Sequence, residues 1–134
     1  MTVFSHYELQ KSLYETLTGD SALMNLVGGI YDRVPDDADF PYVTLGEMRG
    51  RDWSCKTFSG MQYDIQIHVW SREGGRKECA QSMERIHALL HEQSPAVEGQ
   101  ECIVLRFVSS DIQLENDGWN YHGHMQFIAL LAAV

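Results

Sequence analysis

The nine residues from Met61 to Val69 constrain the fold of this chain more than any other stretch. Apolar and polar side chains alternate through it without interruption, so the odd-numbered residues form an apolar face and the even-numbered residues a polar one. A period of two over this length is typical of a β-strand that buries one face and leaves the other in water. We therefore expect a sheet built around this strand, with a second layer packed on its apolar face.

A second strand is predicted just before it, and the segment between the two is polar. Tyr42–Leu45 is rich in residues that favour strands, and Phe40-Pro41 gives it an extended entry, because proline disfavours the helical region for the residue before it. Arg49–Gly60 carries glycines, serines and charges, and is interpreted as a flexible insertion that does not pack against the core.

This insertion is the candidate interface with another subunit or another protein. It holds two aromatic side chains that a polar loop would expose, and exposed aromatics are typical of surfaces that a partner covers. The candidate residues are Arg49, Arg51, Asp52, Trp53, Lys56 and Phe58. An ordinary flexible hairpin loop, whose aromatics fold back onto the sheet, explains the same residues equally well.

Two helices are predicted ahead of the first strand. Phe4–Leu17 has leucines at every fourth position, which make one apolar stripe, and Ser5 and Glu8 have the spacing of a capping box. A second, short helix follows, with Asp20 or Ser21 as its N-cap.

The later elements are read from turn residues and apolar spacing. We expect a brief strand at Ile30–Val34, a turn at Ser71–Gly75, the longest helix at Arg76–His91, and strands at Glu101–Val108 and Tyr121–Ala132. Both faces of Glu101–Val108 are apolar, which predicts a central position in the sheet, between a helix and a partner. Gly123 indicates a bulge in the last strand. Asn116-Asp117-Gly118 predicts a tight turn.

The order of elements indicates an α+β fold of two layers. It comprises a mostly antiparallel sheet of about five strands, packed with two N-terminal helices and one long central helix. The chain has 134 residues, and we expect one domain over residues 1–134. A domain of this size buries roughly two-thirds of its unfolded surface, so it needs no disulfide or metal to hold its core.

Charge and composition exclude several classes of protein. Acidic residues outnumber basic ones by 19 to 10, a net charge of −9, which argues against nucleic-acid binding through a basic face. No apolar run approaches the length of a membrane span, and the first ten residues lack the pattern of a signal peptide. Three cysteines without paired spacing indicate reduced thiols in a cytosolic setting.

Histidines are the best candidates for chemistry. His87 and His91 are four residues apart on a predicted helix, a spacing that suits a metal, but the glutamate of the metalloprotease pattern is absent, so structural or solvent roles are expected. His122 and His124 share one face of the last strand, and His68 lies on the polar face of another. If those strands are neighbours, the three side chains converge, and a small metal-dependent enzyme is the alternative that this would support.

Other sites are not indicated. Cys79 and Cys102 occupy apolar positions of the pattern and are expected in the core, while Cys55 is expected to be exposed and reactive. The sequence has no nucleophile elbow, phosphate loop or dinucleotide-binding motif. We therefore predict no catalytic, cofactor-binding or metal-binding residues.

Several short words of the sequence, in this order, resemble the phage tail completion family, which also occurs in phage-like gene transfer agents. The words are Ile30-Tyr31-Asp32-Arg33-Val34-Pro35, Phe40-Pro41-Tyr42-Val43, and His68-Val69-Trp70-Ser71 followed by Gly75-Arg76. The resemblance runs from about Leu9 to Leu131. Order and spacing carry it, since no single word is diagnostic.

The resemblance implies a structural role without catalytic residues. Members of the family are tail terminator or head-to-tail joining proteins, which form a hexameric ring on the tail tube and dock it to the head connector. The implied partners are other copies of the chain, the tail tube protein and the head connector or adaptor. DNA would pass through the ring without specific binding, no membrane is involved, and the location would be the head-proximal end of the virion tail, after assembly in the host cytoplasm. A head-completion or connector adaptor protein is the alternative within the same class.

Overall fold

The computed structural model describes residues 4–72 and 76–133, so the turn expected at Ser71–Gly75 lies largely outside the described residues. Three helices and five strands follow one another along the chain. They are α1 (His6–Thr18), α2 (Ser21–Leu26), β1 (Ile30–Tyr31), β2 (Tyr42–Asp52), β3 (Gly60–Ser71), α3 (Arg76–Leu90), β4 (Gln100–Leu114) and β5 (Tyr121–Ala133). The predicted α+β fold of two layers is confirmed, although the brief first strand is shorter than expected. Among the described residues, no helix is long and apolar enough to span a membrane.

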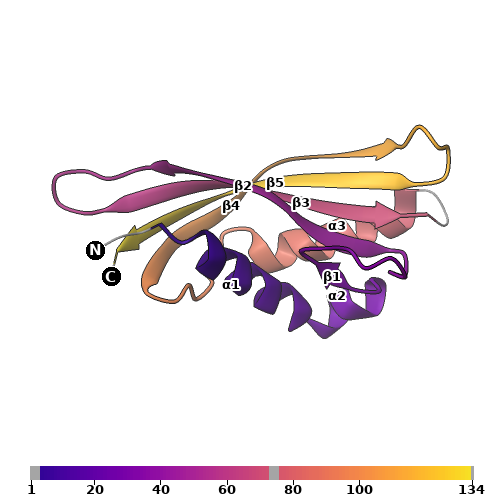
Figure 1. Cartoon of the computed structure of the whole chain (residues 1–134), viewed down its shortest axis with the longest axis horizontal. Helices are drawn as coiled ribbons and strands as arrows, with labels where there is room; N and C mark the ends of the chain where they lie inside the picture. Colours follow the sequence, from indigo (N-terminus) through magenta and orange to yellow (C-terminus); the bar gives the residue numbers. More distant parts are fainter. Residues whose placement is uncertain (1–3, 73–75, 134) are drawn as a thin grey trace.

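The five strands form one sheet in the order β1-β2-β3-β5-β4. The short β1 pairs with β2 in parallel, and the other neighbours are antiparallel. All three helices lie on one side of this sheet, and the opposite face carries no layer of the described chain (Figure 1). At the two ends of the long axis, the β2–β3 hairpin and the β4–β5 hairpin project away from the helices (Figure 1).

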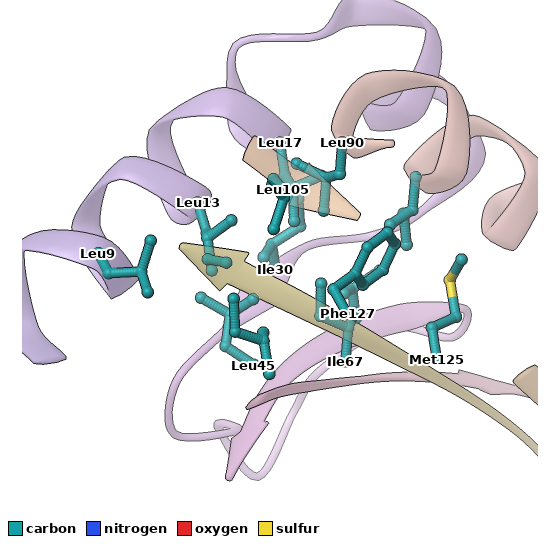
Figure 2. Close-up of a cluster of buried hydrophobic side chains, with 14 of the residues drawn as sticks. Leu9, Leu13, Leu17, Ile30, Leu45, Ile67, Leu90, Leu105, Met125 and Phe127 are labelled. Atoms are coloured by element: carbon teal, nitrogen blue, oxygen red, sulfur yellow. The ribbon is translucent and has the colours of Figure 1, made fainter. Parts of the chain in front are cut away.

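The core lies between the helices and the apolar face of the sheet. The leucine stripe of α1 is buried as predicted, with Leu9, Leu13 and Leu17 at most 1% exposed. Figure 2 shows these side chains converging with residues of the strands, among them Phe127 at the centre of β5. On β3, the alternation of the sequence holds for every buried odd-numbered residue from Tyr63 to Val69. Burial of this apolar face, roughly 25 cal/mol per Å2 removed from water, drives the two layers together.

The start of α1 differs from the prediction, because Ser5 and Glu8 do not form a capping box. The Ser5 side chain makes no capping hydrogen bond. Its backbone N–H instead donates to the Tyr63 hydroxyl across a distance of 2.7 Å, in a buried position. The helix entry is therefore fixed by the central strand β3, a contact between residues 58 positions apart that no local motif encodes.

The start of α2 agrees with the prediction. The Asp20 carboxylate accepts a hydrogen bond from the Leu23 N–H at 2.8 Å, as an N-cap does. The same carboxylate forms a bidentate ion pair with Arg85 of α3, in which the Arg85 Nη2 and Nε atoms donate to the two carboxylate oxygens at 2.7 and 2.8 Å. The hydrogen bond from Arg85 is the main cause that lowers the pKa of Asp20 from 3.8 to about 2. Arg85 therefore ties α3 to the start of α2.

The expectation of a central position for the strand after α3 is wrong. β4 lies at the edge of the sheet, and it extends to Leu114, six residues beyond the predicted end. Its register shifts between Cys102 and Val104 and again between Phe107 and Ser109. Because of these shifts, both even-numbered and odd-numbered residues of β4 point toward the core, while Ile103 and Val108 are exposed. The apolar residues on both faces of the predicted pattern therefore did not mean that both faces are buried.

Gly123 does not mark a bulge. It pairs in regular register with Val69 of β3 and Ile112 of β4. A Cβ atom at this position would come within 2.6 Å of the Cys79 Sγ and the Met83 Sδ of α3. The glycine is therefore required because α3 crosses β5 at close range here.

Candidate assembly surfaces

The predicted interface segment lies at the tip of the β2–β3 hairpin, and its residues 49–52 are ordered strand and not part of a flexible insertion. Arg49, Arg51 and Asp52 belong to β2 and pair with Asp64, Gln62 and Met61 of β3. A register shift between Leu45 and Met48, together with two glycines, breaks the alternation that would have identified this extension. The turn proper covers only residues 53–59.

The turn is held by hydrogen bonds within the hairpin. The Trp53 N–H donates to the Gly60 carbonyl at 2.8 Å, and the Cys55 N–H to the Phe58 carbonyl at 3.0 Å. The Ser54 hydroxyl donates to the Asp52 carboxylate at 2.8 Å and accepts from the Gly60 N–H at 2.9 Å. The tip is thus a defined structure that can present its side chains in a fixed arrangement.

The two aromatic residues of the tip lie edge to face, with ring centroids 5.3 Å apart. Trp53 and Phe58 are 37% and 38% exposed, and both contact the backbone of Gly60. They pack on each other at the end of the hairpin, away from the buried core. The aromatics are therefore folded against their own hairpin and still offer more than a third of their surface to a partner.

Cationic side chains gather on the same hairpin. Arg49, Arg51 and Lys56 are three of the ten basic residues in a chain with 19 acidic ones. Arg49 lies on the face of the sheet that no helix covers, in a hollow shared with Gln66 and with the carboxylates of Glu47 and Asp64. Between residues 49 and 60 these three basic side chains are accompanied by one acidic side chain, Asp52, and this cationic end of the hairpin suits an acidic partner surface.

The three candidate histidines do come together, because β3 and β5 are neighbours. His68 and His124 are directly opposite each other, and His122 lies opposite Trp70. The His68 Nδ1 and His122 Nε2 atoms are 2.6 Å apart, and the His124 ring contacts Gln66 and Asp111. The cluster lies on the uncovered face of the sheet.

Its geometry suits hydrogen bonding and stacking, not metal binding. The His122 ring stacks on Trp70, with centroids 4.0 Å apart and an angle of 4° between the planes, and His68 stacks on His124. The outer nitrogens of His122 and His124 face carboxylates of Glu115 and Asp111 at 3.3 Å. Within the described part of the chain, no group of histidine, cysteine or acidic side chains has the arrangement of a metal site.

The histidine cluster predicts a pH dependence of stability. Burial, and after it the proximity of His122 and His124, lowers the pKa of His68 below its usual 6.5, although Glu47 and Asp111 oppose the shift. The unfolded chain then binds a proton at His68 more readily than the folded one. Neutral His68 therefore contributes to the free energy of unfolding. This contribution is complete above pH 6.5 and is lost as the pH falls through the pKa of His68 in the folded state. We expect the loss of melting temperature between pH 7.5 and pH 5.5 to be smaller for His68→Gln than for the wild-type protein; equal losses would contradict this assignment.

The cysteines behave as the sequence indicates. Cys79 and Cys102 are buried, which raises the pKa of both thiols to about 11. Cys55 is exposed at the hairpin tip, and hydrogen bonds to Thr57 lower its pKa. Cys55 is thus an accessible thiol at the candidate interface.

One surface feature was not predicted, a groove of about 270 Å3 between α3 and the end of β4. Its apolar lining comes mainly from Met83, Phe107, Ile112 and Met125, and Glu84 and His87 lie at the helix side. The sequence could have pointed to it only through Ile112 and Leu114, two apolar residues in alternation within a segment that is otherwise polar.

Comparison with known proteins gives consistent matches over almost the whole chain. Residues 11–132 match the family described as tail completion protein gp17. Tail completion protein gp17 of Bacillus phage SPP1 is 26% identical over 117 residues, which are 86% of this chain and 85% of that protein. The structure of the bacteriophage SPP1 gp17 protein has a TM-score of 0.66 at 22% identity and covers 96% of this chain and 94% of its own.

A second solved structure is more similar in fold. One chain in the virion of a native gene transfer agent particle superposes with a TM-score of 0.89 at 19% identity, covering 98% of this chain and 100% of that one. The family match includes the hairpin, the histidine cluster and the groove, and it assigns a structural role in the virion tail and no enzymatic activity. With residues 11–132 of its 134 matched, this chain belongs to the tail completion protein gp17 family.

Proposed function

We propose that this protein forms a closed ring of six copies on the head-proximal end of the tail tube, stops tube growth and joins the tail to the head connector. The observation that carries the proposal is the match of nearly the whole chain to the tail completion family. A protein that completes a tail must recognise the end of a cylinder, and a ring of identical subunits presents the same contact to every position around it.

The shape of the subunit supports a ring. A cyclic assembly larger than a dimer uses a heterologous interface, in which two different patches of one subunit meet. The cationic hairpin and the opposite end of the sheet lie at the two ends of the long axis (Figure 1). Arg49, Arg51, Asp52, Trp53, Lys56 and Phe58 form the first of these patches in the proposal.

The net charge of −9 supports the passage of DNA through the ring. Proteins hold DNA through basic side chains that release counterions, and an acidic bore offers no such gain. DNA then slides past without specific binding. Measurable binding of the isolated protein to double-stranded DNA at low salt would argue against this part of the proposal.

Particles that lack this protein provide the test of the role. We expect negative-stain microscopy to show overlong tails, tails without heads, or both, and complementation with the wild-type gene to restore joined particles. Normal particles in its absence would overturn the proposal. A pull-down against the tail tube protein and against the portal or adaptor protein distinguishes a tail terminator from a head-completion protein.

A further inference from the structure

The sheet has two open edges. β1 covers β2 only at Val43 and Thr44, so no strand of the described chain pairs with the outer edge of β2 from residue 46 to 52. At the other edge, a bridge from Gln93 to Leu105 covers the first half of β4. Residues 108–114 continue beyond that bridge without a strand paired to their outer side among residues 4–72 and 76–133. Open backbone of this kind readily accepts another strand.

The two open edges run in opposite directions. Three antiparallel steps separate β2 from β4, through β3 and β5, and an odd number of such steps reverses the direction. A rotation about an axis roughly parallel to the strands leaves the strand directions unchanged. The β2 edge of one copy therefore meets the β4 edge of the next copy in antiparallel orientation. Such a contact joins two different patches and can repeat around a ring.

Side chains along the two edges are complementary on both faces of the sheet. On the uncovered face, β2 presents Arg49, and β4 presents Asp111, which contacts His124. On the helix side, β2 presents Met48, and β4 presents Ile112 at the groove. An antiparallel register with Arg49 opposite Asp111 also places Met48 opposite Ile112, because both pairs of numbers have the same sum.

We propose that the outer edge of β2 in one copy, residues 46–52, pairs with the outer edge of β4 in the next copy, residues 108–114, with Arg49 facing Asp111. The inference rests on the ring of the proposed function and identifies the contact that closes it. Cross-strand pairs of opposite charge stabilise such a ladder on one face, and the apolar pair does so on the other. The cationic hairpin then lies on an acidic neighbour.

Pairing these segments requires a stagger between copies. Within one sheet, residues 46–52 of β2 lie level with the first half of β4, through Met61–Ile65 of β3 and Phe127–Leu131 of β5. That half of β4 is already occupied by the bridge at Leu105. The β2 edge of one copy must therefore shift along the strands to reach residues 108–114 of the next copy. A similar stagger occurs between the tilted strands of a closed β-barrel.

Cysteine cross-linking tests the contact. The variant combines Arg49→Cys with Asp111→Cys in a Cys55→Ser background, which removes the exposed native thiol and leaves the buried Cys79 and Cys102. We expect oxidation, both in concentrated solution and in purified tails, to give a ladder of linked chains that ends at the size of the ring. Mixing the two single-cysteine variants should give dimers and nothing larger.

Two outcomes would overturn the edge pairing. One is the absence of a ladder in both solution and tails, and the other is efficient linking of Arg49→Cys to itself, which would mean a symmetric contact. Asn25→Cys on the exposed surface of α2, combined with Asp111→Cys, is the matched control and should not link. Headless or overlong tails without this protein, together with no ladder, would leave the proposed function standing and remove only the pairing.

Reversed charges provide an independent measurement. Arg49→Asp alone places two acidic side chains opposite each other, and we expect it to raise the concentration of half-assembly by roughly tenfold or more. Asp111→Arg alone should have a similar effect. The double variant exchanges the charges and should recover most of the loss, whereas additive losses would contradict the pairing of these two residues.

Discussion

Replacing both aromatics of the hairpin tip, Trp53→Ala with Phe58→Ala, is expected to abolish tail completion while the chain stays folded. Both side chains contact each other and Gly60 at the end of the hairpin, outside the core, so their loss should change the free energy of unfolding by less than about 1 kcal/mol. Aromatic anchors at interfaces contribute about 2 kcal/mol or more each, so the two together correspond to a loss of affinity of roughly 1,000-fold. The measurements are thermal unfolding of the purified variant and the yield of joined particles on complementation.

A matched variant separates the hairpin from a general effect of losing surface aromatics. Tyr14 is 44% exposed on α1 and belongs neither to the hairpin tip nor to the two edge segments of the proposed contact. Tyr14→Ala should support a normal yield of particles. If the hairpin variant also completes tails normally, its aromatics are not an interface, and the alternative of a plain hairpin turn is correct. If it unfolds below the temperature of particle assembly, Trp53→Tyr with Phe58→Tyr retains ring contacts and repeats the comparison.

The layers and the order of elements followed from the sequence because they depend on local periodicity. The leucine stripe of α1 and the alternation of β3 each identify one buried face, and both faces are buried as expected. The two strands that were misjudged, β2 and β4, contain the register shifts of the sheet. After a bulge, the residues that face the core switch between odd and even numbers. A stretch of sequence that crosses a bulge therefore no longer shows the regular alternation of one buried face.

The candidate interface shows the same limit. Its aromatic and basic residues could be named from composition, but the strand pairing that fixes Arg49 and Arg51 on one face depends on contacts with Asp64 and Gln62. Asp111 could not be recognised at all, since its segment was expected to lie beyond the end of a strand. Contacts between distant segments, such as the Ser5–Tyr63 hydrogen bond and the Asp20–Arg85 ion pair, leave no local pattern that distinguishes them from other polar residues.

Stacked histidines illustrate why adjacency alone does not define a site. His68, His122 and His124 meet as the strand order requires, but their rings stack on one another or on Trp70, and their nitrogens are directed to one another, to Gln66 and to carboxylates. A metal needs three or four ligands that converge on one point. The uncovered face of the sheet is instead a polar surface built from hydrogen bonds, and it agrees with a protein that acts through contacts and not through a reaction.

Gly123→Val is expected to destabilise the fold by about 1–3 kcal/mol, because it overpacks the closest approach between the two layers. The first added carbon would meet the sulfur atoms of Cys79 and Met83 within 2.6 Å, and α3 must move to make room. Denaturant unfolding measures the loss. Met83→Ala removes one of the two obstacles, so the double variant should lose less than the sum of the two single losses. Additive losses would mean that α3 does not depend on the absence of a side chain at residue 123.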